Sequence, residues 1–152
     1  MESFYRRLGL EEWVHLRQFA GHGGAILSVA VAVPGLITGS ADGSAKLWSL
    51  DTGLCLRTFT GHLNGVTAVA AFDEGAVLTG SFDCTVKLWD AGTGSCLRTY
   101  DNHDRHVTAV SACGNSSTFV TTSYDKTAKL WTATSTKNIA SLRGLVHESY
   151  SM

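Results

Sequence analysis

The chain has few charged residues and no excess of positive charge. Asp, Glu, Lys and Arg make up 16% of its 152 residues, against roughly 25% in typical soluble domains. Its 12 basic residues balance 13 acidic ones, and the formal net charge at pH 7 is −1. A generally basic nucleic-acid-binding protein is therefore excluded, although this balance leaves room for a local basic patch, and no nucleic acid is expected as a partner. The length fits one ordinary domain.

Long apolar runs and closely spaced cysteine pairs are also missing. The longest apolar stretch, around Ala25–Val33, is too short to cross a bilayer, so no membrane association is expected. No charged segment followed by an apolar one opens the chain, and no signal peptide is predicted. No C-x-x-C pair occurs among the cysteines, which are Cys55, Cys84, Cys96 and Cys113. This spacing argues against a zinc ribbon or a thioredoxin-type site, and it predicts reduced thiols in an intracellular protein, cytoplasmic or nuclear.

The chain instead contains an internal repeat of about 41 residues, in three copies. Tryptophans recur at steps of 41 and 42 residues, aspartates at the same steps, and histidines at steps of 40 and 41. Lys-Leu-Trp stands at 46–48, 87–89 and 129–131, and each copy is preceded by a short Thr- and Ser-containing segment that ends in Asp. Three copies in register exclude chance and indicate a repeat architecture.

Within the second repeat, four short strand signals follow one another. They are predicted at Val66–Phe72, Val77–Ser81, Thr85–Asp90 and Cys96–Tyr100, separated by turn residues such as Gly92-Thr93-Gly94. Four short antiparallel strands in about 40 residues are typical of one blade of a β-propeller.

The residues that open and close each unit carry a family resemblance. Gly21-His22 and Gly61-His62 open units that close on Trp48-Ser49 and Trp89-Asp90, while the third unit opens with Asn102-His103. Over about residues 14–143 the chain resembles the WD-repeat β-propellers. The resemblance implies an all-β fold of three four-stranded antiparallel blades in an open, incomplete propeller. One extra N-terminal strand is predicted at Trp13–Phe19, which aligns with Leu54–Phe59.

The predicted organisation has three parts. Residues 1–12 form an N-terminal extension with a short helix, residues 13–143 form the three-blade domain, and residues 144–152 form a flexible tail. The repeats are placed at about 21–60, 61–101 and 102–143. A closed ring needs about four to eight blades. The chain is therefore expected to be a fragment of a longer propeller, or to self-associate or have its ring completed by further blades.

The resemblance also implies a hydrogen-bonded tetrad of His, Ser or Thr, Asp and Trp in each blade. Carried over by position, the predicted members are His22, Ser40, Asp42, Trp48, His62, Ser81, Asp83, Trp89, His103, Ser123, Asp125 and Trp131. Such a network satisfies polar groups that the packing of blades buries.

No residue is predicted to be catalytic, to bind a cofactor or to hold a metal. An acyl-transfer site needs one nucleophile, one base and one oxyanion hole, whereas the His, Ser and Asp set recurs three times. His103 and His106 offer two imidazoles in one loop, but cysteine or acidic ligands with zinc spacing are lacking. The glycines of Gly92-Thr93-Gly94 do not open a helix and indicate a turn, not a dinucleotide site.

Binding of other proteins is the predicted function. The resemblance implies that the residue before each turn aspartate contacts partners on one face, and these residues are Ala41, Phe82 and Tyr124. Asp104, Arg105 and His106 occupy an adjoining loop. Exposed aromatic side chains beside a polar rim suit a binding hot spot, although both rings could instead pack on their own blades. The expected function is a non-catalytic scaffold, with a substrate-recognition subunit of a ubiquitin ligase as the alternative.

Overall fold

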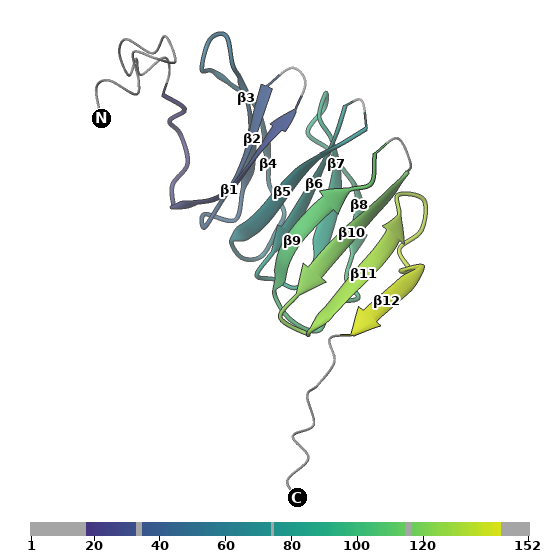
Figure 1. Cartoon of the computed structure of the whole chain (residues 1–152). Coiled ribbons are helices and arrows are strands. Elements are labelled where there is room, and N and C mark those ends of the chain that lie inside the picture. Colours follow the sequence, from purple (N-terminus) through teal and green to yellow (C-terminus); the bar gives the residue numbers. More distant parts are fainter. Residues whose placement is uncertain (1–17, 33–34, 74, 115–116, 144–152) are drawn as a thin grey trace, which may run out of the picture.

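A computed structural model describes residues 18–32, 35–73, 75–114 and 117–143. These residues form three four-stranded antiparallel sheets and contain no helix. The sheets lie side by side in chain order, and each corresponds to one repeat of the sequence (Figure 1). The all-β fold with three blades in an open arrangement is confirmed.

Each sheet keeps its strands in chain order, so each blade is a meander. Blade 1 comprises β1 (Ile26–Ala32), β2 (Gly35–Ser40), β3 (Ala45–Ser49) and β4 (Cys55–Phe59). Blade 2 comprises β5 (Val66–Phe72), β6 (Ala76–Ser81), β7 (Val86–Asp90) and β8 (Cys96–Tyr100). Blade 3 comprises β9 (Val107–Ala112), β10 (Thr118–Ser123), β11 (Thr127–Thr132) and β12 (Ala140–Arg143). The strands predicted in the second repeat are therefore present, with bounds that differ by one residue at most.

The hydrophobic core lies between the blades. Between blades 1 and 2, Ile37 and Leu47 pack with Val66, Val69 and Val77, all nearly inaccessible to solvent. A second cluster joins blade 2 to blade 3 through Leu78, Leu88 and Tyr100 on one side and Phe119 and Trp131 on the other. Because the facing surfaces of neighbouring sheets bury these side chains, stacking of blades stabilises the fold, as in other repeat proteins.

Glycine at one position of β2 and β6 lets neighbouring blades approach closely. A Cβ atom on Gly39 would lie 2.8 Å from Cγ1 of Val66, and one on Gly80 would lie 2.5 Å from Cγ1 of Val107. Thr122 occupies the equivalent position in β10, and its Oγ1 lies 2.8 Å from that of Thr108. Glycine at this point of the first two blades therefore makes room for a valine of the blade that follows.

Several predictions fall outside the described residues. They are the N-terminal helix, most of the extra strand at Trp13–Phe19, and the tail from residue 144. Of the predicted extra strand, Phe19 is described and lies outside any strand. Its ring meets the edge of the Trp48 ring at a centroid distance of 6.0 Å, as Phe59 approaches Trp89 in the next blade at 5.7 Å.

Candidate functional site

A chain of hydrogen bonds links four side chains in every blade. In blade 2, the indole N–H of Trp89 donates to Oγ1 of Thr79 over 2.8 Å, and this oxygen lies 2.7 Å from Nε2 of His62. Nδ1 of His62 lies 2.8 Å from the carboxylate of Asp83. Blade 1 has the same arrangement, formed by Trp48, Thr38, His22 and Asp42. Blade 3 has it as well, formed by Trp131, Thr121, His103 and Asp125.

The chemistry of these groups fixes the direction of the chain. The indole can only donate, so the threonine oxygen accepts from it and has its own proton free to donate to Nε2 of histidine. The carboxylate can only accept, so Nδ1–H of histidine donates to it. Every donor and acceptor is matched when the imidazole is neutral and carries its proton on Nδ1.

The predicted serines are not members of this chain, and that part of the tetrad prediction is wrong. Threonine two residues earlier on the same strand supplies the hydroxyl in all three blades. Ser40, Ser81 and Ser123 end their strands, and each hydroxyl accepts the backbone N–H of the turn aspartate at 3.0–3.1 Å. Ser81 and Ser123 also donate to backbone carbonyls of the loops that enter their blades.

Another hydroxyl, two residues after each aspartate, was not predicted. Thr85 donates its backbone N–H and its side-chain O–H to Oδ1 of Asp83, at 2.9 and 2.7 Å. Ser44 and Thr127 do the same for Asp42 and Asp125. The signal was present in the sequence, because a hydroxyl residue recurs two positions after the aspartate in every repeat.

These bonds change the acidity of the aspartates. Burial acts to raise the pKa of Asp83, but hydrogen bonds from His62, Thr85 and the backbone N–H of Leu63 outweigh it and hold this pKa well below its ordinary value. Burial also acts to raise the pKa of Asp42 and of Asp125. In both, equivalent hydrogen bonds outweigh it and lower the pKa. The carboxylates are therefore ionised in the folded protein at neutral pH.

An aromatic cluster lies where the loop entering blade 3 meets the β6–β7 turn. We call Phe82, His106 and Tyr124 the top-face cluster. The imidazole plane of His106 is nearly perpendicular to both other rings, with centroids 5.1 Å from Phe82 and 6.3 Å from Tyr124. Nδ1 of His106 lies 2.6 Å from the backbone oxygen of Phe82 and is the donor to it. Phe82 is half-buried, whereas Tyr124 is 65% exposed.

The predicted polar residues adjoin this cluster. Asp104, Arg105 and His106 line a pocket of about 500 Å³ together with Cys84 and Tyr124. The structure thus brings together all the predicted partner-binding residues except Phe82 around one pocket, and Phe82 contacts it through His106. Whether a partner binds there remains a prediction.

The two histidines of the blade 3 loop have separate partners. Nδ1 of His103 lies 2.6 Å from Asp125, whereas His106 is held by the backbone of Phe82. Among the described residues, no group of three or more His, Cys, Asp or Glu side chains is placed to hold a metal ion. The same part of the chain has no helix long and apolar enough to cross a membrane.

Comparison with known sequences identifies a family and partial relatives. The family model for the WD domain, G-beta repeat, matches residues 13–49, 53–90 and 94–132. The chain is 41% identical over 70 residues to the probable E3 ubiquitin ligase complex SCF subunit sconB of Aspergillus niger, and 37% identical over 70 residues to that of Emericella nidulans. Each alignment covers 45% of this chain and 10% of the relative. The chain thus spans about a tenth of the length of these relatives.

Comparison with solved structures supports the same fold. The structure of U3-55K matches with a TM-score of 0.79 at 22% identity, over 84% of this chain and 42% of the other. The crystal structure of RRP9 WD40 repeats matches with a TM-score of 0.79 at 23% identity, over 84% and 41% of the two chains.

Proposed function

The chain belongs to the WD-repeat family, and on this basis we propose that it is a non-catalytic scaffold that binds another protein through the top-face cluster and the pocket beside it. The observation that carries the proposal is the exposed ring of Tyr124, which stands against a fixed imidazole at the edge of a pocket lined by Arg105 and Asp104. Tyrosine and arginine are among the side chains enriched at binding hot spots.

The geometry of the blades supports a scaffold that carries no chemistry at the His–Asp pairs. In all three blades the histidine side chain is at most 4% exposed, and both ring nitrogens are already hydrogen-bonded. A general base needs a nitrogen that can reach the proton it removes. These imidazoles hold the turns of the blades in place instead.

Replacement of Tyr124 tests the proposed binding surface. Tyr124→Ser removes an exposed ring and should abolish capture of the partner identified by affinity purification and mass spectrometry, while the melting temperature stays within about 1–2 °C of the parent. Leu97→Ser, at an exposed residue of outer strand β8, is the matched control and should retain the partner. Intact capture by Tyr124→Ser, or equal loss with Leu97→Ser, would place the binding surface elsewhere.

A substrate-recognition subunit of a ubiquitin ligase is the second candidate function. It rests on the 70-residue similarity to proteins named as SCF subunits, which involves less than half of this chain. Co-purification of the chain with the other components of such a ligase from cells would support this function. Their absence, with another partner captured through Tyr124, would favour the simpler scaffold.

Self-association or ring completion by further blades is part of the proposal. On the outer face of blade 1, Val29 is 61% exposed, whereas the equivalent Val69 of blade 2 is 6% exposed because blade 1 covers it. No described residue outside blade 1 covers Val29 in this way.

The cysteines are all free thiols, which supports an intracellular location, cytoplasmic or nuclear.

A further inference from the structure

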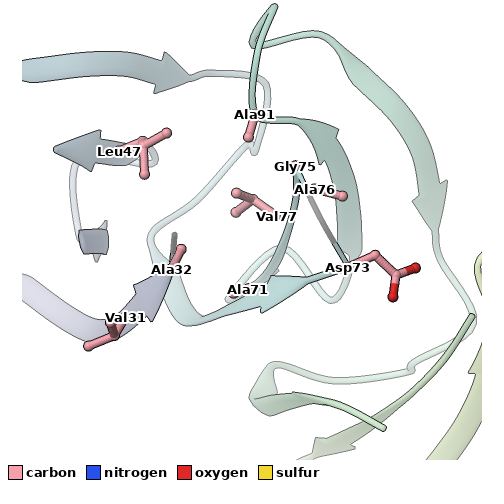
Figure 2. Close-up of a pocket in the computed structure, with 9 residues that line it drawn as sticks. All are labelled: Val31, Ala32, Leu47, Ala71, Asp73, Gly75, Ala76, Val77 and Ala91. Carbon is pink, nitrogen blue, oxygen red and sulfur yellow. The ribbon is translucent and has the colours of Figure 1, made fainter. Parts of the chain in front are cut away.

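A cleft opens between blades 1 and 2 at the opposite ends of the strands from the top-face cluster. Its volume is about 550 Å³, and Figure 2 shows the residues that line it. Ala32 of β1, Leu47 of β3 and Val77 of β6 contribute small or aliphatic side chains to its walls. Gly75 and Asp73 belong to the β5–β6 turn at its rim, and the carboxylate of Asp73 points away from the cleft (Figure 2). Apart from Asp73, the described side chains that line the cleft are therefore apolar.

The same position between blades 2 and 3 is filled by two aromatic rings. By strand register, Phe72 in β5 corresponds to Ala32 in β1, and Phe119 in β10 corresponds to Val77 in β6. The rings of Phe72 and Phe119 meet edge-to-face with centroids 5.8 Å apart, and both are almost fully buried. Ala32 and Val77 are smaller, and none of the described residues that line the cleft carries an aromatic ring, so the cleft takes the place of this aromatic contact.

We propose that this cleft binds a phenylalanine side chain that a partner protein inserts between blades 1 and 2. The cleft lies within the ~300–1,000 Å³ typical of ligand pockets. At its rim the N–H of Ala91 donates to the backbone oxygen of Gly75 over 2.8 Å. These two backbone groups therefore need no hydrogen bond from a bound side chain. A phenyl ring brings no polar atom into the apolar interior, and the neighbouring interface already accepts a ring of this size and orientation.

The site differs from the proposed top-face surface in its position and its residues. No member of the top-face cluster lines the cleft, and the lining residues come from blades 1 and 2 only. A partner could therefore engage both ends of the blades, or two partners could bind at once. Either surface can fail its test without affecting the other.

A variant that fills the cleft from within tests the fit of a ring. Ala32→Phe supplies the side chain that blade 2 carries at Phe72, and burial of the added carbon atoms should raise the melting temperature by about 2–4 °C. Leu97→Phe adds the same ring at an exposed position on β8 and should leave the melting temperature unchanged. A melting temperature of Ala32→Phe equal to or below that of the parent would overturn the proposal.

A titration with a small probe tests binding from solution. N-acetyl-L-phenylalaninamide, added to the full chain, should shift the methyl NMR signals of Leu47, Ala71 and Val77 until they saturate, and N-acetyl-L-alaninamide should not. The response should disappear in Ala32→Phe and persist in Leu97→Phe and in Tyr124→Ser. Shifts of equal size at exposed methyl groups such as those of Leu97, or an unchanged response in Ala32→Phe, would overturn the proposal. So would a raised melting temperature without a saturable titration, because the ring would then fit only as part of the chain.

Discussion

At the scale of single residues, the threonine hydroxyl joins the two halves of each hydrogen-bonded chain. It accepts from the indole and donates to the imidazole, so its loss leaves two groups without partners. The indole of the tryptophan that donates to this hydroxyl is almost fully buried in every blade. Water therefore cannot replace the missing oxygen without opening the packing between blades.

Thr79→Val is expected to destabilise the protein strongly although the side-chain shape is kept. The N–H of Trp89 and Nε2 of His62 would each lose a partner, at about 1–3 kcal/mol for each buried group, or about 2–6 kcal/mol in total. Thr60→Val makes the same change at an exposed threonine between β4 and β5, and it should cost less. Urea unfolding of both variants checks the order, and equal losses would contradict the role assigned to Thr79.

The turn aspartates Asp42, Asp83 and Asp125 lead us to expect that the folded protein is less stable in acid. Their pKa values are lower in the folded protein than the ordinary value of 3.8. The unfolded chain therefore binds more protons in this range, and the free energy of unfolding should fall as the pH drops below about 4. Above about pH 5 this contribution is complete and should not change with pH.

Denaturant unfolding at pH 7, 4 and 3 measures this effect. Asp83→Asn should be less stable than the parent at pH 7 and should lose less stability between pH 4 and pH 3. Asp51→Asn, at an exposed aspartate of the β3–β4 turn, is the control and should follow the parent curve. Parallel curves for the parent and Asp83→Asn would refute a stabilising charge on Asp83.

At the scale of elements, close contact between a strand of one blade and the next depends on glycine. Gly80→Ala would place a carbon atom 2.5 Å from Cγ1 of Val107, and the two backbones would have to separate. The expected cost is about 1–3 kcal/mol, the usual range for overpacking. Gly23→Ala is the control, because its Cβ would meet nothing closer than 3.9 Å and Leu63 already stands at the equivalent place in the second repeat. Thermal melts compare the two, and a tolerated Gly80→Ala would show that the blades adjust freely here.

The strands were predictable from the sequence because each has its own local signal. Val66–Phe72 is a continuous apolar run between turn residues, and three aligned copies removed doubt about register. The choice between Thr79 and Ser81 was not predictable, because both hydroxyl residues recur in the repeats and lie on the same face of one strand. What separates them is position, since Ser81 ends the strand and its oxygen serves the turn. The cleft beside Ala32 was also missed, because it depends on two small residues in different repeats.

At the scale of the whole molecule, the outer face of blade 1 is a surface that no other described blade covers. Ile26, Val29 and Val31 are exposed on one strand, and each is apolar. Contiguous apolar surface of this kind promotes association. The low share of charged residues provides little repulsion to oppose it.

Light scattering at several concentrations should therefore give a mass above the 16.2 kDa of one chain. Val29→Glu places a charge in the centre of the exposed face and should lower the mass towards that of a monomer. Leu97→Glu, on outer strand β8, should not. A monomer at all concentrations for the parent chain would remove the basis for self-association through blade 1.

Thr122 limits how these repeats can be recombined. The first two repeats carry glycine at the point of closest approach, and the blade that follows packs against it. A tandem array made by copying the third repeat would set the Thr122 side chain against the valine of every following copy. We expect such an array to stack less well than one in which glycine replaces this threonine, or one made by copying the first or second repeat.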